Sequence, residues 1–234
     1  LVDGALTRRT SLEIDVQGGS TEVPDLVGVA QPDLLLLNDD DLTFAKIRLD
    51  VRSLETVTAH FGGVADPLAR ALLWGAMWDM TRDGEISTSA FTDTVISGLG
   101  DEREVGMVEQ VLRQADSALA FYAAPERREE YNQRLADFLE DLLRKAEPGS
   151  DHQLAYMRGF SVFAASPEHV ALLRGLLDGT TTIDGLAIDT DLRWTLLTRL
   201  VVLGEAGNQE IEEELARDDT AAGRLYAATC RAAS

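Results

Sequence analysis

The pattern of apolar residues changes near residue 50. Upstream of that point, the stretch "TSLEIDVQG" places Leu12, Ile14 and Val16 at every second position, with polar residues between them. Alternation of this kind is typical of a half-buried strand. Farther on, "LLLLNDDDLTFAKIRLD" sets an acidic triplet between two apolar runs, and Asn38–Asp41 has the composition of a turn. We therefore predict strands within residues 1–50, with a hairpin tip at Asn38–Asp41.

From residue 51 onward the apolar residues recur with a period of 3.6. One example is the set Val108, Val111, Leu112, Ala115 and Leu119, which falls on one side of a helix. Asp66-Pro67 and Ser166-Pro167 each place a capping residue before a proline that suits the first helical position. The pattern predicts about ten helices, over residues 53–62, 67–82, 88–99, 102–123, 126–145, 151–165, 168–178, 191–204, 209–217 and 220–232.

The links between these helices are short, so neighbouring helices are expected to pack antiparallel. Residues 180–188, "TTTIDGLAI", carry only a weak strand pattern. A series of short antiparallel helices is typical of an α-solenoid of the HEAT or armadillo kind, although no strict sequence repeat is present. We therefore predict a mainly α fold with two parts, residues 1–50 and residues 51–234.

Composition excludes several function classes. The chain has 234 residues, of which 45% are hydrophobic and 26% are charged, and its net charge is −20. Such a chain can bury a core, but it would repel a phosphate backbone and an anionic membrane surface. We expect no nucleic-acid partner and no membrane partner. Cationic partners are favoured.

Cysteine usage points to a reducing compartment. Cys230 is the single cysteine, so neither a disulfide framework nor a cysteine-based zinc cluster can form. No apolar run reaches the roughly 18 residues that a membrane helix needs, and no signal peptide is evident. These features predict a cytoplasmic protein. The chain also begins with Leu1 and not with methionine, which suggests a piece of a longer protein.

No motif for metal binding or catalysis is present. The histidines are His60, His152 and His169, and they form no His-Glu-x-x-His motif and no pair at i, i+4. Nucleophile elbows and phosphate-binding glycine loops are also missing. Asp39–Asp41 lacks the spacing of a calcium loop, and successive strand residues point to opposite faces, so a solvated turn is favoured over a cation site.

Three arginines on otherwise apolar helices could bind a carboxylate. Arg193 and Arg199 lie in "DTDLRWTLLTRLVVLG", and Arg158 lies in "AYMRGF". A guanidinium beside an apolar stripe can hold the carboxylate of a peptide. The alternative is an arginine whose stem packs while its head meets one of the 41 acidic residues of the chain. We take Arg158, Arg193 and Arg199 as the candidate peptide-contact residues.

Four segments carry a resemblance to a known family: "NDDDLTFAKIRLD", "ALLWGAMWDMTRDGE", "DTDLRWTLLTRLVVLG" and "IEEELARDDTAAG". Together they resemble the C-terminal region of aminopeptidase N, from the gluzincin zinc aminopeptidases, and the actinobacterial branch in particular. The resemblance spans essentially the whole chain in the same order. It implies that residues 1–50 are part of a small β-sandwich domain and that residues 51–234 are the C-terminal helical superhelical domain.

The family's catalytic motifs are missing from this chain. Its zinc motif, its catalytic tyrosine and its Gly-Ala-Met-Glu-Asn segment do not occur, and Gly75-Ala76-Met77 is followed by Trp78-Asp79 on a predicted helix. The resemblance therefore implies that catalytic residues and zinc belong to the parent enzyme and that this chain holds none. As partners it implies the catalytic and N-terminal domains of the parent chain, and peptide substrates.

The expected role is non-catalytic. The resemblance implies that this part encloses the active-site chamber of an enzyme that releases N-terminal residues from peptides, and helps to limit and position those peptides. An alternative is a free-standing helical-repeat scaffold that binds other proteins. A third possibility, an enzyme with its own site here, has no motif in its support.

Overall fold

The helices are built where the 3.6-residue pattern predicts them. A computed structural model of the chain describes residues 4–233, and this part holds ten α-helices and four short 3-10 helices. The α-helices are α1 (Val51–His60), α2 (Pro67–Arg82), α3 (Thr88–Gly98), α4 (Val105–Phe121), α5 (Arg128–Lys145), α6 (Asp151–Phe163), α7 (Pro167–Asp178), α8 (Thr190–Val202), α9 (Asn208–Arg217) and α10 (Ala221–Ala233). The 3-10 helices are η1 (Pro24–Leu26), η2 (Phe61–Gly63), η3 (Leu99–Asp101) and η4 (Pro125–Arg127).

The two predicted Pro-containing starts are confirmed. The Asp66 side chain accepts a hydrogen bond from the Ala69 amide at 3.0 Å, and Pro67 opens α2. The Ser166 hydroxyl accepts the His169 amide at 3.3 Å at the start of α7. Such caps satisfy backbone N–H groups that a helix cannot bond internally. They explain why these helices begin where the sequence indicates.

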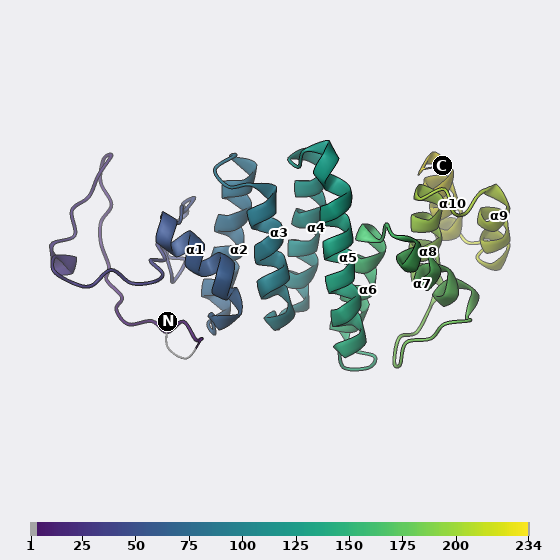
Figure 1. The fold of residues 1–234 in the computed structure, drawn as a ribbon, viewed down its shortest axis with the longest axis horizontal. Helices are drawn as coiled ribbons and strands as arrows, with labels where there is room; N and C mark the ends of the chain where they lie inside the picture. The colour runs from purple at the N-terminus through teal and green to yellow at the C-terminus, as the bar shows by residue number, and fades with distance from the viewer. Residues whose placement is uncertain (1–3, 234) are drawn as a thin grey trace.

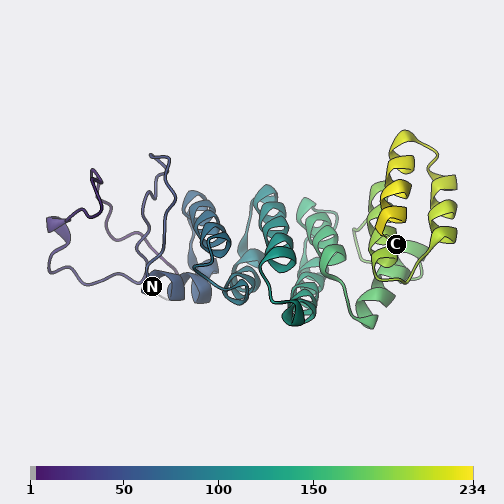
Figure 2. The ribbon, with the colours of Figure 1, turned by 90° about the horizontal axis from the view of Figure 1, so that it is seen from above.

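The helices stand side by side along the long axis of the molecule (Figure 1). Seen from above, helices α1 to α6 form two rows, with the even-numbered helices in one and the odd-numbered helices in the other (Figure 2). Helices pack both along the rows and between them. The helices α2, α4, α6, α8 and α10 contact one another in succession, α1, α3 and α5 do so in the other row, and α5 packs most extensively on α6 across the rows. No helix within residues 4–233 is long and apolar enough to cross a bilayer.

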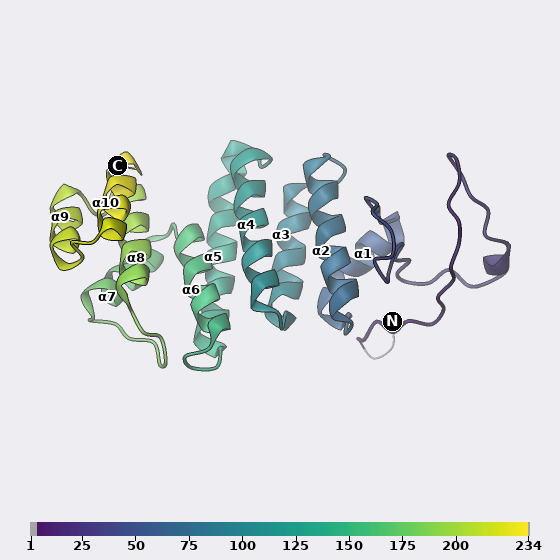
Figure 3. The same cartoon turned by 180° about the vertical axis from the view of Figure 1, so that it is seen from behind.

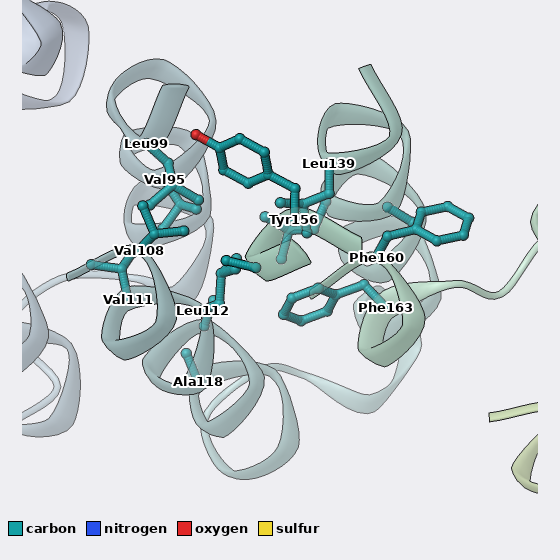
Figure 4. Packing of buried hydrophobic residues seen from close by; sticks show 14 of the residues in the cluster. Val95, Leu99, Val108, Val111, Leu112, Ala118, Leu139, Tyr156, Phe160 and Phe163 are labelled. Atoms are coloured by element: carbon teal, nitrogen blue, oxygen red, sulfur yellow. The ribbon is translucent and has the colours of Figure 1, made fainter. Parts of the chain in front are cut away.

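One apolar core runs between the rows. It extends from Ile47 to Leu200 and contains fully buried side chains such as Trp74, Phe91 and Phe160. Figure 4 shows a central part of it, in which side chains of α3, α4, α5 and α6 interdigitate. A separate small cluster joins α8 to α9 and α10. Its members are Trp194, Leu197, Val201, Ile211, Ala227 and Cys230.

A buried ion pair ties the first helices together. The Arg70 Nε of α2 donates to Glu102 Oε2 at 3.0 Å, and the Trp74 indole donates to the same oxygen at 3.2 Å. Arg70 also donates to the carbonyl oxygens of Val64 and Gly98. Because each buried charge has several partners, the cost of removing it from water is offset.

The strands predicted within residues 1–50 do not form in this structure. Residues 4–50 contain no strand, only isolated bridge residues, of which Leu6 pairs with Val64. A strand is stable only when its backbone groups bond to a neighbouring strand, and here only the Leu6 amide does so, to the Gly63 carbonyl at 2.8 Å. The alternating residue Val16 is 75% exposed. A mainly α fold is therefore confirmed, whereas the β-sandwich portion is not seen.

The turn predicted at Asn38–Asp41 is present, although no hairpin flanks it. The Asp41 amide donates to the Asn38 carbonyl at 2.9 Å, and both residues have a positive φ, 56° for Asn38 and 52° for Asp41. The Asn38 side chain bonds the backbone of Thr43 in both directions. Arg8 pairs with Asp39 and Asp40 at the surface. The acidic triplet thus forms a solvated turn with an arginine partner.

Candidate functional site

The three candidate arginines lie on two even-numbered helices and serve three separate contacts. Arg158 is on α6, whereas Arg193 and Arg199 are on α8. Six residues separate the two on α8, so they face different sides of that helix. The structure does not bring the three guanidinium groups together in one carboxylate site.

Arg193 is held by Glu214 of α9. Its Nε and Nη2 donate to the two carboxylate oxygens at 2.6 and 2.7 Å, and its Nη1 donates to the Leu177 carbonyl at 2.9 Å. The Glu214 side chain is buried, and hydrogen bonding to it raises the pKa of Arg193. A bidentate pair of this kind has strict geometry. Arg193 therefore joins α7, α8 and α9. This arrangement matches the alternative considered from the sequence, an arginine paired with an acidic residue of the same chain.

A cavity of about 210 Å³ adjoins Arg193, between the end of α7 and the start of α8. Its wall is mixed, with apolar residues such as Leu176, Ile183 and Leu186 beside polar residues such as Thr181 and Thr182. The only charged side chains in this wall are Asp178 and Arg193. Because Glu214 already neutralises Arg193, this cavity offers little attraction for a free carboxylate.

Arg199 bonds to the backbone at the end of α6. Its Nε and Nη2 donate to the Ala164 carbonyl at 2.8 and 2.6 Å, which occupies an oxygen that the helix leaves unpaired. Burial lowers the pKa of Arg199, and the negative charge of Asp116 opposes this shift. The side chain lines a second cavity of about 160 Å³. The other lining residues are Asp116, Leu119, Ala120, Arg128, Asn132 and Val162.

Asp116 stands at the exposed rim of this second cavity, on α4. It has no hydrogen bond and no ion pair with any residue in the described range 4–233. Partial desolvation raises the pKa of its carboxyl group, and Arg199 reduces this rise through its charge. The sequence reading did not single out Asp116, Arg128 or Asn132. What these residues share is a place in the wall of one cavity, which helix packing creates and sequence spacing does not show.

Arg158 is the most accessible of the three arginines. Its side chain is 47% exposed, and its one ion pair, with Glu109 of α4, spans 4.0 Å. Val162, which lines the second cavity, lies four residues farther along α6 and so on the same side of the helix. The exposed side of α4, α6 and α8 thus carries Arg158 and the cavity of Arg199.

The histidines have structural partners or lie at a helix end. His152 Nε2 lies 3.1 Å from the Glu102 carbonyl oxygen, and buried His169 lies 2.9 Å from Asp137 through Nε2. His60 ends α1 and is exposed. Among residues 4–233, no group of three His, Cys, Asp or Glu side chains could hold a metal ion. The side chains of residues 4–233 therefore offer no ligand set that fits zinc.

Two comparisons identify what the chain is similar to. A family model described as the ERAP1-like C-terminal domain matches residues 34–234. Aminopeptidase N of Streptomyces lividans is 50% identical over 230 residues, which are 98% of this chain and 27% of that protein. The chain therefore spans about a quarter of the length of the curated relative it matches. Together with the row of ten helices, the match to 34–234 shows that this chain belongs to the ERAP1-like C-terminal domain family.

Proposed function

We propose that this chain is the non-catalytic C-terminal part of a zinc aminopeptidase, and that its helices enclose the chamber in which peptides are cleaved. The 50% identity to an aminopeptidase N over almost the whole chain carries this proposal. The two rows of helices support an α-solenoid, whose extended surface suits enclosure. Enclosure would exclude water from the chemistry and order the substrate.

Residues 1–50 are proposed to belong to a β-sandwich that other parts of the parent complete. The family model begins at residue 34, whereas the aligned relative matches 98% of the chain. The match to the relative therefore also covers most of residues 1–33, which the family model does not include. The alternating residues Leu12, Ile14 and Val16 are exposed, as they would be without strands to pack on. We propose the domain boundary near residue 50 because the helices begin with α1 at Val51, although the family model starts at residue 34.

Catalysis is assigned to the rest of the parent enzyme. Zinc would be held there, since residues 4–233 supply no ligand set for it. The partners of this chain would be the catalytic and N-terminal domains and the peptide substrates. We place the parent in the cytoplasm, because a single buried cysteine suits a reducing compartment.

Among the three candidate arginines, Arg158 is the one proposed to contact the carboxylate end of a peptide. Its guanidinium is exposed and weakly paired, so a carboxylate can compete with Glu109. Arg193 is committed to Glu214, and Arg199 is turned toward the Ala164 carbonyl. Through its contacts Arg193 connects α7, α8 and α9. Arg199 instead lines the second cavity.

The proposal is tested by assaying the purified 234-residue chain for zinc content and for release of amino acids from aminoacyl amides. We expect neither tight zinc binding nor turnover. Turnover by a metal-checked sample would refute a non-catalytic role. The alternative of a free-standing scaffold is separated by reading the gene upstream of Leu1. An in-frame His-Glu-x-x-His motif supports the aminopeptidase, and its absence from the complete reading frame supports the scaffold.

A further inference from the structure

The second cavity lies where the ends of several helices meet. Asp116, Leu119 and Ala120 come from the second half of α4, Arg128 and Asn132 from the first turns of α5, and Val162 and Arg199 from α6 and α8. Its volume is about 160 Å³, well below the roughly 300 Å³ of clefts that hold drug-sized ligands. A ligand here would be about the size of one amino acid.

The two arginines of this cavity are exceptional in this chain. Acidic residues outnumber Lys and Arg by 41 to 21, and most arginines have a carboxylate within 4.0 Å. Within the described residues, the arginines that have none are Arg9, Arg103, Arg128 and Arg199. Two of these line one cavity. Free positive charge is therefore concentrated there.

Both guanidinium groups keep donors for a ligand. Arg199 uses Nε and Nη2 on the Ala164 carbonyl, and Arg128 uses Nε on the Ala123 carbonyl at 3.3 Å. In the described part of the chain, Arg199 Nη1 and both terminal nitrogens of Arg128 have no hydrogen-bond acceptor. These N–H groups suit a carboxylate, which guanidinium groups bind with good geometry.

Asp116 adds the opposite charge to the same cavity. Its carboxylate is more than 4.0 Å from the nitrogen atoms of Arg199, since the two form no ion pair, yet Arg199 is near enough to act on it through its charge. A simple anion would satisfy the arginines and would face repulsion from Asp116. A ligand that carries an ammonium group beside its carboxylate satisfies both sides.

We propose that this cavity binds a free α-amino acid with an aliphatic side chain. Its carboxylate bonds to Arg199 and Arg128, its ammonium group faces Asp116, and its side chain packs on Leu119 and Val162. A peptide C-terminus has an amide in place of the ammonium group, so it leaves Asp116 without a cation. A free amino acid is also the class of product that the proposed parent enzyme would release, although the binding itself does not depend on that activity.

The test is a titration of the isotope-labelled 234-residue chain, followed by its amide resonances. The four probes are L-leucine, N-acetyl-L-leucine, isocaproate and isoamylamine, which separate the zwitterion from a peptide C-terminus, a carboxylate and an amine. We expect saturable shifts near Ala120 and Val162 with leucine, and binding at least about tenfold weaker with each of the others, because each lacks one charge-assisted contact.

Two variants sharpen this test. Asp116→Asn keeps the side-chain size and removes the partner of the ammonium group, so leucine should bind about tenfold more weakly. Arg144→Gln, at the end of α5 that is remote from the cavity, should bind leucine as the original chain does. Equal binding of leucine and N-acetyl-leucine, an unchanged Asp116→Asn variant, or no saturable shift with leucine would each overturn the proposal. Because the readout is binding to this chain alone, none of these outcomes bears on whether the parent cleaves peptides.

Discussion

At the scale of single residues, the surroundings of a charged side chain decide its role more than its position in the sequence. Arg158 and Arg193 were equal candidates by pattern, because each lies beside an apolar helical stripe. The structure separates them through one partner, Glu214, which is 21 residues from Arg193 and holds it in a bidentate pair. Only Arg158 keeps an exposed guanidinium with a weak ion pair.

This difference yields a prediction for the parent enzyme. Arg158→Ala should raise KM for peptides with a free C-terminal carboxylate, by a few-fold to about tenfold, and leave KM for the same peptides with an amidated C-terminus unchanged. Arg113→Ala is the matched control, because Arg113 also pairs with Glu109, at 3.8 Å, and is 69% exposed. Steady-state kinetics of both variants provide the measurement. Equal effects of the two variants would show that general charge and not a specific contact is responsible.

At the scale of helices, much of the fold could be predicted from the sequence. All ten predicted helices are present, and α2 spans Pro67–Arg82 as expected, because Asp66 and Pro67 mark its start. The prediction is less accurate for the start of α4. It was predicted at residue 102, and the helix begins at Val105 because the Glu102 side chain bonds to Arg70 and accepts the Arg103 amide. A partner 32 residues away cannot be seen in local periodicity.

Partners distant in sequence also explain why the cavity was not predicted. Arg199 was singled out, but its neighbours Asp116 and Arg128 lie on other helices, and only helix packing brings them together. On α4, the period of 3.6 shows merely that Asp116 borders the buried stripe of Leu112, Ala115 and Leu119. Sequence periodicity therefore fixes which side of a helix is buried, and it does not fix which polar groups meet at its edge.

The glycines of α2 and α6 give a prediction about helix packing. A Cβ added to Gly159 would lie 2.7 Å from Leu112 Cδ1 and 3.3 Å from Leu139 Cδ1, whereas one added to Gly75 would meet nothing within 4 Å. Gly159→Ala should lower the free energy of unfolding by about 1–2 kcal/mol, because overpacking against the two leucines exceeds the roughly 0.5–1 kcal/mol that alanine gains in a helix. Gly75→Ala should raise it by about 0.5–1 kcal/mol, because alanine favours the helix. Urea denaturation of both variants tests this, and stabilisation by Gly159→Ala would show that α6 can move away from α4 at little cost.

At the scale of the whole molecule, the helical part and the N-terminal segment differ in how they are held. The helices share one core, whereas the segment extends away from the end of the helical row (Figure 3). Its attachment begins near residue 34, where Leu34 and Leu36 pack on the core and the Leu35 amide donates to the Ser53 hydroxyl at 2.8 Å. The family match begins at the same residue. Residues 4–33 contribute little to the core beyond Leu6.

Removal of residues 1–33 should therefore leave the helical part folded and reduce self-association. Exposed apolar residues such as Val16 and Val27 are lost, and patches of this kind favour contacts between molecules.

The net charge of −20 opposes those contacts at low salt, so association of the full chain should increase as salt screens the repulsion. Light scattering over a concentration series at two salt levels measures both effects. Circular dichroism should show an unfolding temperature only a few degrees lower for the shortened chain. The losses are the partial packing of Leu6, its backbone bond to Gly63, worth about 1 kcal/mol, and the exposed ion pairs of Arg8 and Asp33. A shortened chain that associates as strongly as the full one would place the contact on the helices, and a shortened chain that loses helix would show that the segment supports the core.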